Sequence, residues 1–186
     1  MTSPAYSLRH AAARDADALA AIYNDAVENG TAIWNETRTD AQGRRAWLDA
    51  RQARGFPVLV AVDAGDSVAG YASYGEWRPF EGFRHTVEHS VYVDARARGA
   101  GLGRVLLAAL IEEARAADLH VMVGAVEAGN VASIRLHKGL GFVECGRMPQ
   151  VGAKFGRWLD LVFLQRQLND AATPPATRET AARSEG

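Results

Sequence analysis

The sequence has little cysteine, little lysine and no long apolar run. Its one cysteine, Cys145, has no second cysteine for an internal disulfide, so we expect a reducing compartment, the cytoplasm. No stretch approaches the roughly 20 apolar residues that span a bilayer, and the opening MTSPAYSLRH has no apolar core of signal-peptide length. A formal net charge of −1 provides no overall field for nucleic acid or an anionic membrane, and we expect neither as a partner.

The basic residues are nearly all arginines, because only Lys138 and Lys154 are lysines. Arginine suits planar recognition of carboxylate and phosphate. The 186 residues are enough for one domain with a single core, which we expect over residues 1–168. Residues 169–186 are polar, contain Pro-Pro and show no periodicity, so they are expected to form a disordered tail.

Apolar residues alternate or recur at helical spacing along most of residues 6–168. The patterns predict strands over 6–10, 56–62, 68–77, 86–93, 120–127, 143–148 and 158–168, and helices over 16–27, about 40–54, 101–117 and 130–142. Expected N-caps are Asp15, a Thr39–Gln42 capping box and Asn130. This order predicts an α/β fold with a mixed, mainly antiparallel sheet of about seven strands flanked by about four helices.

A glycine-rich loop separates the strand over 86–93 from the following helix. Gly99, Gly101 and Gly103 stand there between Arg98 and Arg104. A helix N-terminus presents unpaired N–H groups and the positive end of the helix dipole, so the loop is a candidate anion site. The spacing matches neither the Walker loop nor the dinucleotide fingerprint. A tight turn without a ligand is the alternative.

The run Arg98-Gly99-Ala100-Gly101-Leu102-Gly103 resembles the R/Q-x-x-G-x-G/A signature of the GNAT superfamily of N-acetyltransferases. Asn130 and the later LHKGLGF are similar to the superfamily's Asn, apolar helix and Gly-Phe pattern. The segments IYNDAV, TAIWNETRT, YASYGEWRPFEGFRHTVEHSVYV and GRWLDLVFLQ look like its phosphinothricin acetyltransferase branch. The resemblance covers residues 6–168.

The resemblance implies a GNAT fold and transfer of acetyl from acetyl-CoA, without a metal, to the α-amine of phosphinothricin, methionine sulfoximine or methionine sulfone. It also implies a homodimer. The residues that it assigns to acetyl-CoA are Val91, Tyr92 and Val93 for the pantetheine arm, Gly99, Ala100, Gly101, Leu102, Gly103 and Arg104 for the pyrophosphate, and Asn130. Asn130 can also serve simply as a helix N-cap.

Glu88 is the expected catalytic base. Alternation places Glu88, Ser90 and Tyr92 on one face of their strand and His89 on the other. A carboxylate just before the acetyl-binding segment can take a proton from the amine, directly or through water. The alternative for Glu88 is a solvated strand residue, and His89 and Ser90 are substrate-site neighbours.

His137 has two readings. It could protonate the leaving thiolate or assist the base, since this chain has no Tyr where many GNAT relatives carry one. It could equally be a helix histidine that packs under the sheet. The identity of the acid is therefore left open.

The carboxylate of an amino-acid substrate needs a planar cationic partner. Arg78 is the first choice, in the segment Arg78-Pro79-Phe80, with Phe80 as an apolar wall and Arg84 as a second candidate; the alternative for both arginines is an exposed loop. Trp34 either covers the side-chain pocket, from this chain or a neighbouring subunit, or anchors its own loop.

Two other functions stay open at this point. The acceptor could be a polyamine, an antibiotic or a protein N-terminus. The chain could instead be a non-catalytic module that binds CoA.

Overall fold

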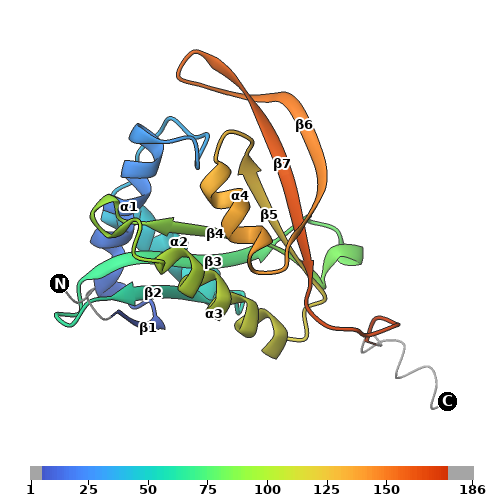
Figure 1. The fold of residues 1–186 in the computed structure, drawn as a ribbon. Helices are drawn as coiled ribbons and strands as arrows, with labels where there is room; N and C mark the ends of the chain where they lie inside the picture. Colours follow the sequence, from blue (N-terminus) through green and yellow to red (C-terminus); the bar gives the residue numbers. More distant parts are fainter. Residues whose placement is uncertain (1–5, 176–186) are drawn as a thin grey trace.

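The computed structural model describes residues 6–175 and shows a seven-stranded sheet between two layers of helices (Figure 1). The strands are β1 (Ser7–His10), β2 (Val58–Val62), β3 (Val68–Glu76), β4 (Thr86–Val93), β5 (Val121–Glu127), β6 (Val143–Lys154) and β7 (Arg157–Gln167). The helices are α1 (Ala16–Asn29), α2 (Ala41–Ala53), α3 (Leu102–Ala116) and α4 (Val131–Lys138), with short 3₁₀ turns at Ala13–Asp15, Glu81–Phe83 and Ala95–Ala97. The predicted α/β class with a mixed sheet and four helices is confirmed.

The sheet order is β1-β2-β3-β4-β5-β7-β6. Every neighbouring pair is antiparallel except β4 and β5, which are parallel because α3 carries the chain back across the sheet between them. Their pairing covers only Thr86–Glu88 against Val121–Val123. Beyond Glu88 the two strands run without a shared register, and this opening determines where a ligand can enter the sheet.

The strands bury side chains on both faces. Leu106, Leu107 and Leu110 of α3 pack on one face, whereas Leu19 of α1 and Leu48 of α2 pack on the other. These side chains are nearly inaccessible to solvent. Burying a Leu side chain contributes about 1.5–3 kcal/mol, so both layers stabilise the sheet between them.

The β6–β7 hairpin extends past the rest of the sheet and bends over the end of α1 (Figure 1). The strand expected over 143–148 is longer in the structure, because β6 continues past Pro149 to Lys154. A register shift between Met148 and Gly152, with Gln150 at a φ of 53°, accommodates Pro149 without ending the ladder.

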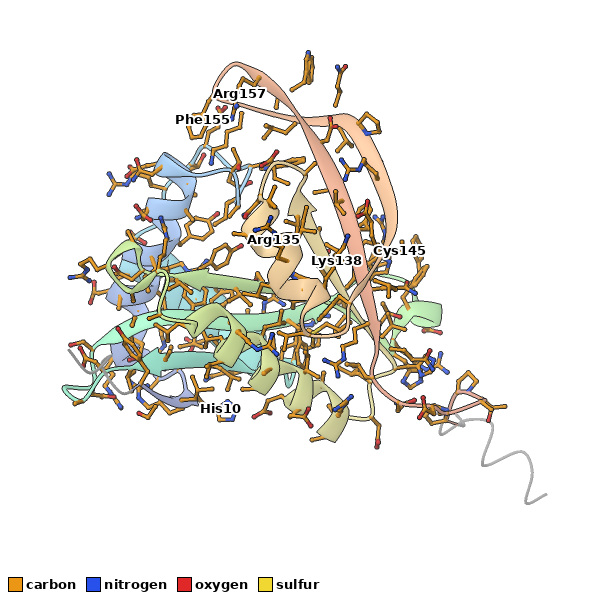
Figure 2. All side chains as sticks on the ribbon, viewed as in Figure 1. His10, Arg135, Lys138, Cys145, Phe155 and Arg157 are labelled. Atoms are coloured by element: carbon orange, nitrogen blue, oxygen red, sulfur yellow. The ribbon has the colours of Figure 1, made fainter. Side chains whose placement is uncertain are left out.

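Lys154 ties this hairpin to the loop after α1. Its buried ammonium group donates to the carbonyl oxygens of Gly30 at 2.8 Å and Ile33 at 2.5 Å. Burial lowers the pKa of Lys154. The ring of Trp34 lies in the space that a side chain at Gly152 would occupy. Figure 2 shows Phe155 and Arg157 at the tip of the hairpin.

One of the three expected helix caps is wrong, and a second is right only in its position. Asp40, not Thr39, caps α2, because its carboxylate accepts from the Gly43 N–H at 2.7 Å. Asp15 stands at the N-cap position of α1 but makes no cap bond there. It accepts from the Ala12 N–H at 2.7 Å and pairs with Arg9 at 2.8 Å. Asn130 caps α4 as predicted, accepting from the Ser133 N–H at 3.1 Å.

The expected tail is described only in part, because residues 176–186 lie outside the described residues. Its first residue, Asn169, is held by the chain before it: Nδ2 donates to the Leu119 carbonyl at 3.0 Å, and Oδ1 lies 2.8 Å from His120 Nδ1. Across residues 6–175, no helix combines the length and the apolar character needed to cross a membrane.

Candidate active site

A cavity of about 660 Å³ occupies the opening between β4 and β5. Its walls come from both strands, the end of α1 with its following loop, the start of α3, and α4. The lining includes Glu88 to Val93, Ala125 to Glu127, Asn29 to Ala32, Arg98, Gly103, Asn130, Ser133 and His137. Because β5 no longer pairs with β4 here, the β5-facing edge of β4 is open to a ligand with amide groups.

Glu88 stands where the two strands part, half-buried at one end of the cavity. The predicted alternation along β4 is confirmed by the cores, since Tyr92 packs against the α1–α2 side and Val87 against the α3 side. Burial raises the pKa of Glu88, and the positive charges of Arg78 and Arg51 oppose that rise. A carboxylate with a raised pKa is a stronger base than one in water.

The glycine loop begins α3 at the cavity. Gly99 and Gly101 have φ values of 81° and 78°, and a Cβ at either would meet nothing within 4 Å. They are therefore glycines because of the left-handed backbone and not for lack of room. Gly103 is different, since a Cβ there would lie 3.1 Å from Leu136 Cδ1 of α4. Gly101 is the N-cap and has no side chain to cover the first N–H groups of α3.

The two arginines that flank the loop already have partners within the chain. Arg98 pairs with Asp25 of α1 at 2.5 Å and donates to the Val93 carbonyl at 3.2 Å. Arg104 donates to the Gly139 carbonyl at 3.1 Å. Arg98 lines the cavity, whereas Arg104 lies outside its wall. These contacts join the loop to α1 on one side and to the end of α4 on the other.

His89 and His137 form a buried stacked pair at the cavity, with ring centroids 5.0 Å apart. His137 Nδ1 lies 2.7 Å from the Ser133 carbonyl and must donate to it, so the neutral ring accepts at Nε2 from His89 Nε2 at 3.0 Å. A Cβ at Gly124 would lie 2.8 Å from one ring and 2.9 Å from the other. Burial and the neighbouring His137 lower the pKa of His89 to about 3, and burial also lowers that of His137.

This pairing bears on the two readings of His137. Both ring nitrogens are engaged, and Nε2 carries no proton that it could donate. Phe142 packs edge-on against both rings, 5.6 Å from His89 and 5.1 Å from His137. The geometry therefore favours the packing role over the role of acid.

The residues after β3 that are expected to bind the amino-acid substrate are not part of the cavity wall. Arg78 is exposed and lies over the ring of Trp77 at 4.7 Å, which in turn contacts Phe163 of β7 at 5.4 Å. Phe80 follows Pro79 in the same loop and is 67% exposed. Arg84 donates to the Glu81 carbonyl within its own turn at 3.1 Å.

Trp34 behaves as an anchor for its own loop. Its indole N–H donates to the Thr31 carbonyl at 2.9 Å, and its ring lies against Gly152 of the hairpin.

Sequence reasoning missed two features of this region. Thr31 donates to Glu127 Oε2 at 3.1 Å, which joins the loop after α1 to the end of β5 at the cavity rim. Arg51 of α2 lies across Gly75, the residue of β3 directly opposite Glu88. The only sequence signal for Arg51 is the glycine itself, because glycine inside a strand often marks a close approach.

No three His, Cys, Asp or Glu side chains come together as a metal site anywhere in residues 6–175. The groups around the cavity are instead open backbone, a helix start, the carboxylates of Glu88 and Glu127, and a pair of neutral imidazoles. Such an arrangement can hold an extended ligand that carries a phosphate and can move a proton at Glu88.

The chain is similar to a family of known proteins in sequence and in structure. Residues 19–142 match the model of the acetyltransferase (GNAT) family. The chain is 62% identical over 169 residues to the L-methionine sulfoximine/L-methionine sulfone acetyltransferase of Pseudomonas aeruginosa, covering 91% of this chain and 98% of the relative. It is 40% identical over 160 residues to the phosphinothricin N-acetyltransferase of Alcaligenes faecalis, covering 86% and 81%. The structure of yncA from Salmonella typhimurium with acetyl-CoA has a TM-score of 0.90 at 54% identity, covering 92% of this chain and 99% of that one.

The buried imidazole of His89 predicts a specific loss of stability in acid. The pKa of His89 is about 3 in the folded chain against an ordinary 6.5, so the unfolded chain binds the proton more tightly. The stabilisation is complete above pH 6.5 and is lost as the pH falls from there toward 3, by up to about 1.4 kcal/mol per pH unit. Urea unfolding at pH 7.5 and pH 5 measures it. In His89→Gln the difference between the two pH values should shrink, because glutamine does not titrate.

His10→Gln makes the same change at an exposed histidine and is the matched control. It should change the difference between the two pH values less than His89→Gln does. An unchanged pH dependence in His89→Gln would contradict the assignment.

Proposed function

The chain belongs to the acetyltransferase (GNAT) family, and we propose that it acetylates the α-amine of L-methionine sulfone, L-methionine sulfoximine and related amino acids with Glu88 as the base. It is an acetyl-CoA-dependent N-acetyltransferase whose relatives act on these amino acids or on phosphinothricin. The observation that carries the assignment of the base is the position of Glu88, half-buried where β4 and β5 separate.

The cavity residues fit acetyl-CoA. The open edge of β4 at Val91, Tyr92 and Val93 can pair with the amides of the pantetheine arm as an added strand would. The N–H groups from Gly99 to Gly103 lie in the loop before α3 and in its first two residues, with Gly103 in the cavity wall, and they would hold the pyrophosphate. Asn130 lines the cavity and caps α4, so it can contact acetyl-CoA and also serve as the helix cap. When bound, acetyl-CoA supplies the activated acetyl group.

The chain's residues then have two tasks at the reacting carbon. The amine of an amino acid must lose a proton before it attacks, and the Glu88 carboxylate receives that proton directly or through water. An N–H group of the open β4 edge can donate to the oxygen that gains charge as the amine adds. For the leaving group, a thiol with an ordinary pKa of about 8.5 can depart as thiolate. In this proposal His137, paired with His89, has a structural role.

Replacing the base tests this proposal. With acetyl-CoA and L-methionine sulfone, Glu88→Gln should lower kcat about 10²–10⁴-fold, because glutamine cannot accept the proton. Acetyl-CoA binding, measured by calorimetry, should change little. Thiol release measures turnover, and Glu112→Gln, exposed on α3, is the matched control. Full activity in Glu88→Gln would show that Glu88 is not the base. A wild-type protein that acetylates no amine would refute the proposed function itself.

Arg78 is the proposed partner of the substrate carboxylate. It is exposed beside the Glu88 end of the cavity, and its charge acts on Glu88. The amine and carboxylate of an α-amino acid share one carbon, so their protein partners must also be neighbours.

Arg78→Ala should lower kcat/KM for L-methionine sulfone about 10–100-fold, the effect of a lost charged hydrogen bond of about 1.5–3 kcal/mol. The same amine without its carboxylate, 3-(methylsulfonyl)propylamine, should be acetylated equally well by both proteins. Arg84→Ala tests the second candidate in the same assay. Equal losses on both amines, or no loss on either, would count against carboxylate recognition by Arg78.

We also propose a homodimer in which a second copy packs against the β6–β7 hairpin. Met148, Val151, Phe155 and Trp158 expose large apolar surfaces there, with Trp158 70% exposed. Several exposed large apolar side chains on one hairpin favour an interaction surface there. The proposal agrees with the edge position of β6 in the sheet.

Trp158→Glu should convert the dimer to a monomer in size-exclusion chromatography with light scattering, because a carboxylate would be buried without a partner. Val105→Glu, at an exposed valine of α3, should leave the mass unchanged. A wild-type protein that is monomeric at all accessible concentrations would rule out the dimer.

A further inference from the structure

Glu88 has no side chain opposite it on β3. The residue in register with it is Gly75. Directly opposed residues of an antiparallel pair carry Cβ atoms about 4.5–5.5 Å apart, so a side chain at 75 would be the nearest neighbour of Glu88 on that side. The guanidinium of Arg51 fills this place instead, because a Cβ built on Gly75 would overlap Arg51 Nη1 and lie 2.8 Å from its Cζ.

A backbone carbonyl group and two aromatic rings hold Arg51 in this place, without an acidic side chain. Its Nη1 donates to the Tyr74 carbonyl at 2.8 Å, and its guanidinium lies 5.6 Å from the ring of Trp47 and 5.8 Å from that of Phe56. Glu76, the nearest acidic residue along β3, pairs with Arg54. Within residues 6–175, Arg51 has no carboxylate at ion-pairing distance, and its positive charge acts on Glu88 without a salt bridge.

We propose that Arg51 is a positioning residue that keeps Glu88 in its carboxylate form, and that Gly75 is glycine to admit the guanidinium beside that carboxylate. The inference rests on the proposed role of Glu88 as the base. A half-buried carboxylate resists ionisation, and a fixed cation that does not bond to it offsets that cost while leaving its oxygens available to the amine.

Few other charged groups around Glu88 could replace the charge of Arg51. The residues in register with Glu88, which are Gly75 on β3 and Val123 on β5, do not titrate. Arg78 supplies the second positive charge, and Tyr92 lies further along the same face of β4.

On the α2 side, Arg44 and Arg54 add positive charge around Arg51 itself. Burial and these two arginines lower the pKa of Arg51, whereas Tyr92 and Glu88 act in the opposite direction.

The test is the pH profile of kcat with acetyl-CoA and L-methionine sulfone. Arg51→Gln removes the charge, so the pKa of Glu88 should rise and the acidic limb should move up by about 1 pH unit, a tenfold loss at pH values on that limb. Arg51→Lys keeps the charge and should keep the limb at the wild-type pH. Gly75→Ala keeps the arginine but displaces its guanidinium, so its limb should move in the same direction as that of Arg51→Gln.

Two controls match these changes. Arg45 lies on the same helix, is exposed and pairs with Asp49 at 2.9 Å. Arg45→Gln removes this charge and should leave the acidic limb in place. Gly146→Ala adds a methyl group on β6 where nothing lies within 4 Å, and it should also leave the limb in place. Thermal melting of each variant shows that it is folded.

An acidic limb that does not move in Arg51→Gln would overturn the proposal. A loss confined to carboxylate-bearing amines, absent with 3-(methylsulfonyl)propylamine and without a shift of the limb, would also overturn it by making Arg51 a substrate ligand. Failure of the proposed function is a separate result, because the wild type would then show no turnover or Glu88→Gln would be fully active.

Discussion

The short parallel pairing of β4 with β5 is the constraint on which this structure depends. Three residues of each strand are in register, and the last pair is Glu88 with Val123. Parallel strands need a crossover connection, and here it is the glycine loop with α3. The same connection therefore separates the strands, begins a helix at the resulting cavity and leaves one edge of β4 without a partner.

The two faces of β4 have different environments, and this separates two kinds of titratable group. Glu88 faces the α1–α2 side, where arginines from α2 and from the loop after β3 act on it. His89, one residue later, faces the α3 side and is buried against His137 and Phe142. One residue step along β4 therefore separates a carboxylate in a polar, partly open environment from an imidazole in a closed apolar one. Nearby positive charges offset the effect of burial on the pKa of Glu88, whereas burial and His137 together lower the pKa of His89.

The rim of the cavity is fixed by contacts between segments that are far apart in sequence. Lys154 of the hairpin binds carbonyl groups after α1, and Thr31 from that loop binds Glu127 at the end of β5. No carboxylate from the described part of the chain bonds to the buried Lys154, and backbone oxygens solvate its charge in place of water. The loop over residues 30–34 is consequently part of the folded framework around the cavity and is joined to the element that carries the exposed apolar patch.

The sequence alone determined the elements, the fold class and the face on which each β4 side chain lies, because these follow from local periodicity and from the glycine loop. It also predicted a helix that begins near Gly101, which is the N-cap of α3, and it made Glu88 a candidate for the base. It did not determine the partner of His137, the role of Trp34 as an anchor, the extension of β6 past Pro149, or the position of Arg51 over Gly75. Each of these depends on strand register or on contacts across more than 20 residues of chain, and local propensity carries no information about such contacts. Tertiary structure decided them because a buried charge or imidazole takes whichever partner the packing of distant elements brings within reach.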